Sequence, residues 1–237
     1  SDVCSSDLGS SKQFPTNVIY TNYSCDLALL EISFEKDKDV FEKLVQYLPL
    51  HLELPQPGTK LSTQGFPTGG QGYCTTEGSV SRVESAVYSN YATAMLRIQI
   101  SAPTNSGSSG GIVIAEASKK VLGITQSIVS TAQNVGYVIP SQVIQTFLEQ
   151  FLRIEKNPYR NTITFPSLMF NVQSLRQRGL RKQYGLHDDL EENGVLIKDI
   201  SPLCIANRLL KVGDVLLSID AYNVRSDGKI NYQGAEI

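Results

Sequence analysis

The sequence predicts a mainly β protein that is followed by a smaller α+β module. Short apolar runs recur along residues 17–139 and are separated by turns rich in glycine. This spacing is typical of a barrel or a sandwich of β-strands. A helical period follows at 143–152, and the polar segment 157–161 then breaks the pattern. We therefore expect a domain boundary at that break.

Each predicted strand is a short run of apolar or alternating residues. The runs are 17–20, 27–32, 75–83, 94–100, 111–114, 121–124 and 136–139. Residues 48–55 alternate between two prolines and also fit a strand, with His51 on the polar face. The glycines at 65–72 lack the ending of a phosphate-binding loop, so they predict a turn between strands.

Two segments of the β region have helical spacing. Residues 40–48 place apolar side chains on one face, which predicts a short amphipathic helix with its apolar stripe in the core. Pro140 and Ser141 offer a start for a longer helix, in which Val143, Phe147 and Phe151 recur on one face. This helix closes the β region.

Composition excludes several classes of protein. The 237 residues are 41% hydrophobic and carry a net charge of −2, so they provide no basic surface for nucleic acid. No apolar run approaches the roughly 20 residues of a membrane span. The four cysteines are widely spaced, which argues against a metal site or a disulfide framework and favours reduced thiols in an intracellular or organellar compartment. We expect no cofactor.

The chemistry suggested by the sequence is nucleophilic catalysis by serine. Ser109 lies between Gly107 and Gly110-Gly111, where glycines allow backbone N–H groups to converge on one point. Asp26 begins an apolar run upstream. A serine nucleophile needs a histidine base, a carboxylate that orients it, and N–H donors for the oxyanion. Asp26, Ser109 and the N–H groups of Gly107 and Ser109 fit three of these roles.

The sequence lacks a suitable histidine to act as the base for Ser109. The sequence has two histidines, His51 and His187, and both follow Asp26. The order Asp, His, Ser occurs in subtilisin-like enzymes, but His51 lacks the small and glycine neighbours expected there. We interpret His51 as structural and His187 as part of a polar loop. A catalytic histidine is therefore expected upstream of this sequence.

Six motifs occur in order and carry a resemblance to a known family: CDLALLEI, GFPTGG, EGSVSRVE, NSGSSGG, VLGITQS and NVGYVIPSQVI. The chain resembles the HtrA/Deg serine proteases, especially the plant-type Deg branch, from about residue 16 onward. The resemblance implies a chymotrypsin-like double β-barrel, with its N-terminal barrel truncated here, followed by a PDZ-like domain. It also implies ATP-independent endopeptidase activity on unfolded or damaged proteins, and trimer-based oligomers.

The resemblance assigns roles to individual positions. Asp26 matches the triad aspartate, Ser109 the nucleophile, and Gly107 with Ser109 the oxyanion hole. The substrate-binding positions are Ile124, Thr125 and Gln126 on the strand that pairs with substrate, and Tyr137 and Val138 near the specificity pocket. The sequence departs from the family pattern at Ser108, which replaces asparagine, and at Ile112, which replaces proline. Ser106 and Ser108 are neighbouring hydroxyls, but only Ser109 has the complete glycine flanks.

The C-terminal region is predicted to be the PDZ-like module. A strand at 194–200, a Ser201-Pro202 start, a helix at 206–210, and a turn followed by an alternating strand within 212–220 fit that pattern. Residues Ser167, Leu168, Met169 and Phe170 match its carboxylate-binding loop, with Met169 in place of the expected glycine. Such a loop binds a peptide C-terminus through backbone N–H groups.

Four segments are expected in all. Residues 1–10 resemble a non-native or disordered tail, 11–157 the protease domain without its N-terminal part, 158–164 a linker, and 165–237 a PDZ-like domain that is incomplete at its C-terminus. Two functions stay open. One is a serine endopeptidase whose histidine lies outside the sequence, in which case this fragment alone is inactive. The other is a pseudoprotease that binds peptides or acts as a scaffold.

Overall fold

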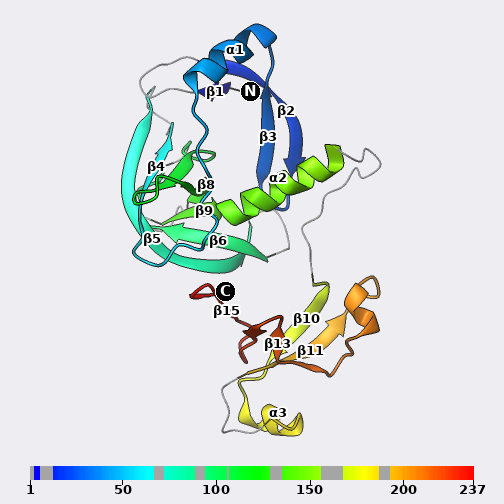
Figure 1. The fold of residues 1–237 in the computed structure, drawn as a ribbon. Helices are drawn as coiled ribbons and strands as arrows, with labels where there is room; N and C mark the ends of the chain where they lie inside the picture. The colour runs from blue at the N-terminus through cyan, green and yellow to red at the C-terminus, as the bar shows by residue number, and fades with distance from the viewer. Residues whose placement is uncertain are drawn as a thin grey trace. The chain divides into compact units, whose positions relative to one another are not determined.

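The computed structural model describes residues 3–5, 13–66, 72–88, 94–105, 107–128, 135–155, 168–186 and 193–237 (Figure 1). The chain divides into two compact units, Ser1–Phe165 and Pro166–Ile237. The prediction of a mainly β chain with a barrel is confirmed. Among the described helices, none combines the length and apolar character that a membrane span requires.

The first unit is built on a closed barrel of six antiparallel strands. These are β4 (Lys60–Gly65), β5 (Cys74–Val87), β6 (Ala94–Ile100), β7 (Ile112–Ala115), β8 (Val121–Ile128) and β9 (Gly136–Pro140). Their order around the barrel is β4-β5-β6-β9-β8-β7. The side chains that fill it are almost fully buried and include Leu61, Val80, Ile98, Val113 and Leu122. The barrel closes because β7 pairs with β4, which removes both sheet edges.

A separate sheet precedes the barrel and contains β1 (Val3–Ser5), β2 (Gln13–Asn22) and β3 (Leu27–Ile32) in that order. Residues 1–10 were expected to be a non-native or disordered tail, but Val3–Ser5 form β1, which pairs antiparallel with β2. A β-strand can recruit a polar segment in this way because the ladder uses backbone groups alone.

Helix α1 (Glu35–Leu44) begins earlier than the predicted segment 40–48. None of its residues is buried, so the prediction of a core-facing stripe is wrong. Charged residues occupy most of its first two turns and keep this helix at the surface. Its Phe41 ring does contact the ring of Phe14 edge to face, with centroids 5.4 Å apart.

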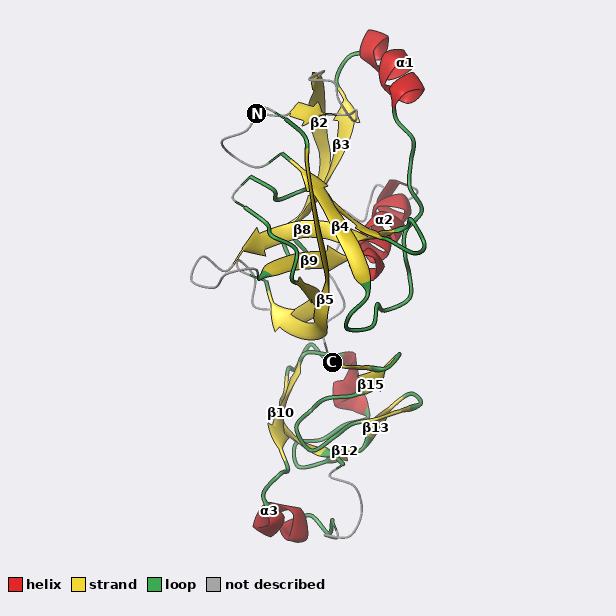
Figure 2. Ribbon diagram, turned by 90° about the vertical axis from the view of Figure 1, so that its left-hand side faces the viewer, coloured by secondary structure: helices red, strands yellow, loops and turns green. Residues whose placement is uncertain are grey.

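Helix α2 (Ser141–Glu155) lies beside one end of β2 and β3 in the views of Figures 1 and 2. Its buried residues Val143, Ile144 and Phe147 pack into a core cluster with β3 and β9. The Tyr20 ring on β2 lies 5.3 Å from the Phe147 ring. The predicted helix and its buried face are confirmed, and the cluster joins the N-terminal sheet to the barrel.

The predicted strand at 48–55 is wrong. Only Leu50 forms a bridge there, with Val121, and the following residues have no ladder. Pro49 and Pro55 lack the N–H that a ladder needs, which explains why the alternating pattern does not become a strand.

The second unit has a three-stranded antiparallel sheet of β10 (Phe170–Ser174), β11 (Val195–Ile200) and β12 (Val215–Leu216), in that order. Two hairpins follow, β13 (Ser218–Ile219) with β14 (Tyr222–Asn223) and β15 (Asn231–Tyr232) with β16 (Ala235–Glu236). Helix α3 (Arg178–Gln183), which the sequence did not predict, lies between β10 and β11.

Two predictions in this unit need correction. The predicted helix at 206–210 is a single 3-10 turn, Ile205–Arg208, and the predicted strand at 212–220 is divided between β12 and β13. Ile205 and Leu209 are 86% and 85% exposed, so no packing supports a longer helix. Such short helices are not stable by propensity alone.

Candidate active site

Asp26 is held at the end of a tight turn between β2 and β3. The Ser24 N–H donates to Asn22 Oδ1 at 2.9 Å, and Asp26 has a left-handed backbone with φ of 57°. Aspartate tolerates this conformation better than most residues. Its neighbours Cys25 and Leu27 are buried in the core cluster, while Asp26 itself is exposed. The core therefore fixes the backbone and leaves the carboxylate at the surface.

In the loop at residues 107–111, which we call the Ser109 loop, some backbone N–H groups donate hydrogen bonds to described residues and others do not. The N–H groups of Ser108, Gly110 and Gly111 donate to backbone carbonyls at 3.0, 2.8 and 3.1 Å. Those of Gly107 and Ser109 have no acceptor within the described part of the chain. Gly107 has φ of 91°, a conformation that suits glycine and bends the loop at this point. The two unused donors are the pair predicted for an oxyanion hole.

The side chain of Thr125 holds the Ser109 loop in place through contacts with two of its backbone carbonyls. Its buried hydroxyl donates to the Ser108 carbonyl, and it lies 3.1 Å from the Gly111 carbonyl. A cavity of about 20 Å³ lies beside these groups and is lined by Cys74, Thr76 and Ser108 among others. This space is large enough for one water. The backbone of Thr125 contacts the same loop, because its N–H donates to the Gly111 carbonyl and its carbonyl accepts the Gly110 N–H, both at 2.8 Å. Thr125 thus supports the loop through both its side chain and its backbone.

Ser109 and Asp26 each form a hydrogen bond with the same residue, Gln126 on β8. The Ser109 hydroxyl donates to the Gln126 carbonyl at 2.9 Å, and Gln126 Nε2 donates to Asp26 Oδ2 at 3.3 Å. Asp26 and Gln126 are 100 residues apart in the sequence. The structure therefore brings the predicted nucleophile and the predicted carboxylate to the same strand.

The other predicted substrate-binding residues differ in exposure. Ile124 is half-buried and packs against the core cluster. Tyr137 is half-buried, and the Arg97 guanidinium lies 3.7 Å from its ring centroid while Arg97 Nη2 lies 2.6 Å from Glu84 Oε1. Val138 is fully buried in the barrel. Its backbone pairs with Ile98 of β6 on one side and with Thr125 of β8 on the other.

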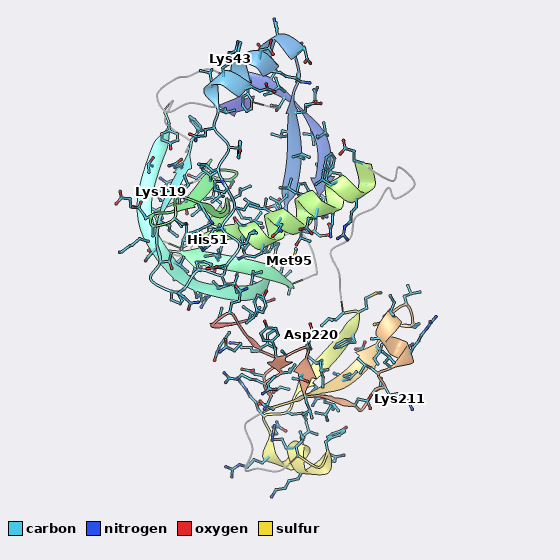
Figure 3. All side chains as sticks on the ribbon, in the orientation of Figure 1. Lys43, His51, Met95, Lys119, Lys211 and Asp220 are labelled. Atoms are coloured by element: carbon cyan, nitrogen blue, oxygen red, sulfur yellow. The ribbon has the colours of Figure 1, made fainter. Side chains whose placement is uncertain are left out.

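His51 contacts Ser118 and Val121 rather than Ser109 or Asp26. Its ring Nδ1 lies 3.4 Å from Ser118 Oγ, and its backbone N–H donates to the Val121 carbonyl at 2.8 Å. Figure 3 shows His51 near the start of α2, in agreement with the hydrogen bond from Gln142 Nε2 to the Leu52 carbonyl at 2.9 Å. These contacts agree with its interpretation as structural.

Several predicted positions fall outside the described residues, namely Ser106, Ser167, His187 and the segment 158–164. In the described ranges, no group of three or more histidine, cysteine, aspartate or glutamate side chains is arranged to hold a metal ion.

In the second unit, the predicted carboxylate-binding loop is described from Leu168 onward. Met169 has φ of 54°, the left-handed conformation that glycine adopts most easily, at the position where the family pattern has glycine. The Met169 carbonyl accepts the Ser201 N–H at 2.9 Å, and the Leu168 carbonyl accepts Cys204 Sγ at 3.1 Å. The backbone therefore keeps a glycine-like shape despite the methionine, and Phe170 continues from it as the first residue of β10.

Cys25, beside Asp26, gives a prediction for pH dependence. Burial raises the pKa of the Cys25 thiol from 9.0 to about 12, because the thiolate loses its hydration. A raised folded-state pKa stabilises the fold below pH 9, and this contribution is lost as the pH rises from 9 towards 12. We expect the free energy of unfolding in urea to fall over that window by less in Cys25→Ser than in the unsubstituted chain. An equal fall in both proteins would contradict this cause.

Comparison with known proteins fits this geometry. Residues 2–124 match the trypsin-like peptidase domain. The chain belongs to the trypsin-like peptidase family. Its relatives include Do-like proteases and a DegP homologue, as the resemblance to the HtrA/Deg proteases predicted.

Among its relatives, putative protease Do-like 3, mitochondrial, of Arabidopsis thaliana is 32% identical over 228 residues, which are 96% of this chain and 38% of the relative. Protease Do-like 4, mitochondrial, of the same organism is 33% identical over 229 residues, with 96% and 41% covered. The solved HtrA-type protease AlgW with tripeptide aligns with a TM-score of 0.64 at 22% identity, covering 95% of this chain and 75% of that one. The chain spans about two fifths of the length of these plant relatives.

Proposed function

We propose that the complete protein is a serine endopeptidase of the HtrA/Deg kind, in which Ser109 is the nucleophile and Asp26 orients a histidine contributed from outside these 237 residues. The observation that carries this proposal is that Ser109 and Asp26 both hydrogen-bond to Gln126, Ser109 to its carbonyl and Asp26 to its side-chain amide. The unused N–H groups of Gly107 and Ser109 support it, because a tetrahedral intermediate needs two such donors for its oxyanion.

The roles follow from the chemistry of acyl transfer. The histidine takes the proton of Ser109 Oγ as that oxygen attacks the peptide carbonyl, and it returns the proton to the leaving amine. Asp26 stabilises the imidazolium that forms. Among the described residues the Ser109 hydroxyl donates to the Gln126 carbonyl. This hydrogen bond supports the proposal that the 237 residues alone, without the histidine, are inactive.

Substrates and partners are part of the proposal. Unfolded or damaged proteins fit an ATP-independent endopeptidase, since an extended backbone can pair with β8 beyond Ile124, where the ladder of β8 with β7 ends. AlgW was solved with a tripeptide, which supports peptides as ligands here, through the protease site or the carboxylate-binding loop at 167–170. The relatives' names favour a mitochondrial or chloroplast location. We also propose a trimer-based oligomer.

A serine-reactive fluorophosphonate probe tests the proposal on the complete protein. We expect labelling at Ser109, since the probe requires a serine activated by its base. A peptide map of the labelled protein identifies the site. An absence of labelling in a folded, complete protein would instead support the alternative, a pseudoprotease that binds peptides, because an intact serine loop without a base still has its shape.

A further inference from the structure

We propose that Gln126 is a positioning residue for catalysis, whose side-chain amide holds the Asp26 carboxylate in the orientation that the histidine base requires. This inference rests on the proposed function, since it concerns the same site. It assigns the side chain of Gln126 a role towards Asp26, in addition to the role of its backbone towards substrate.

The contact itself is specific. Gln126 Nε2 donates to Asp26 Oδ2 at 3.3 Å, and among the described residues no other side chain donates to this carboxylate. Oδ1 therefore stays free to accept the N–H of an imidazole. An exposed carboxylate without a fixed partner samples several rotamers. One amide donor is enough to favour the rotamer that the base needs.

The backbone on both sides of this contact is already fixed. β8 pairs with β9 on either side of Gln126, through Thr125 with Val138 and Ser127 with Tyr137, and the register shifts between these two pairs, so Gln126 is the extra residue of a β-bulge. Asp26 is anchored by Cys25 and Leu27 in the core cluster, and Ile124 packs against that same cluster. The neighbours of both residues are therefore held by the ladder and the core cluster, and the hydrogen bond from the amide to the carboxylate restricts rotation of the two side chains.

The same residue also contacts the nucleophile, because its carbonyl accepts the Ser109 hydroxyl at 2.9 Å. A single strand residue thus sets the separation between carboxylate and nucleophile. A residue with a shorter or apolar side chain at 126 keeps the carbonyl contact and loses only the contact with Asp26. This separation of backbone and side-chain roles makes the inference testable by substitution.

The test is a double-mutant cycle in the complete protein: unsubstituted, Gln126→Met, Asp26→Asn, and both together. Methionine preserves the length of glutamine and removes the amide. We expect Gln126→Met alone to lower kcat on a peptide substrate about 3- to 10-fold with KM little changed, since one hydrogen bond is lost. In the Asp26→Asn background the same substitution should change kcat less than twofold. The low kcat values of the two variants that carry Asp26→Asn are measured at high enzyme concentration.

Two outcomes contradict the inference: an equal loss in both backgrounds, which indicates a general effect on strand packing, or no loss from Gln126→Met. Gln183→Met, at an exposed position in α3, is the matched control and should leave kcat unchanged. Urea unfolding of the same four proteins gives a readout that does not need activity, and the hydrogen bond predicts non-additive free energies there. Additive unfolding energies overturn the inference, whereas an inactive unsubstituted protein with coupled energies overturns the proposed function.

Discussion

Ser109→Ala in the complete protein is expected to lower kcat/KM for casein by roughly 10⁴-fold or more and to abolish fluorophosphonate labelling. The hydroxyl removed is the proposed nucleophile, and the remaining histidine and oxyanion donors have no covalent path to the peptide bond. The fold should be unaffected, because Ser109 is exposed and its only hydrogen bond among described residues is to the Gln126 carbonyl. Casein hydrolysis and a urea unfolding curve measure the two effects.

Ser108→Ala is the matched control for this substitution. Among the described residues the Ser108 hydroxyl has one long contact, of 3.4 Å, in which it accepts the Asn105 N–H. Thr125 supports this residue through the Ser108 carbonyl. We expect casein hydrolysis to stay within about tenfold of the unsubstituted protein. Hydrolysis that survives Ser109→Ala and is lost in Ser108→Ala would assign the nucleophile to Ser108.

The barrel could be predicted from the sequence because its signal is local. Strands such as β6 and β9 are short apolar or alternating runs, and each is bounded by residues that favour turns. The same local rule failed at 48–55, where prolines at both ends withhold the N–H groups that pairing needs. It also missed α3, whose six residues carry little apolar periodicity.

The residue types of the candidate site could be predicted from the sequence, but the contacts between them could not. Ser109 and its flanking glycines form a contiguous motif, so the sequence alone indicates Ser109 as a candidate nucleophile. The Asp26 to Gln126 contact joins residues 100 positions apart and depends on the register of β8, which no local pattern encodes. Met169 illustrates the opposite case. Methionine replaces the glycine of the family pattern, but its backbone takes the left-handed conformation, and its carbonyl accepts the Ser201 N–H.

Gly111→Ala is expected to destabilise the first unit by about 2 to 3 kcal/mol and to reduce fluorophosphonate labelling of the complete protein at least tenfold. A Cβ at this position would lie 2.3 Å from the Gln64 carbonyl oxygen and 3.0 Å from that of Ser108. Both are backbone atoms. Relief of the contact requires β4 and β7 to separate at the point where they close the barrel, or the Ser109 loop to move.

The control is Gly72→Ala, because a Cβ there meets nothing within 4 Å and its backbone does not need glycine. Its unfolding midpoint in urea should match that of the unsubstituted chain. The decisive comparison is labelling at a urea concentration where both variants remain folded. If Gly111→Ala is destabilised but labels at the normal rate, the added methyl group has displaced β4 and β7 without moving the Ser109 loop. The geometry of that loop would then not depend on the pairing of β4 with β7. If both properties fall together, the closure of the barrel through β4 and β7 is what holds the N–H groups of Gly107 and Ser109 in place.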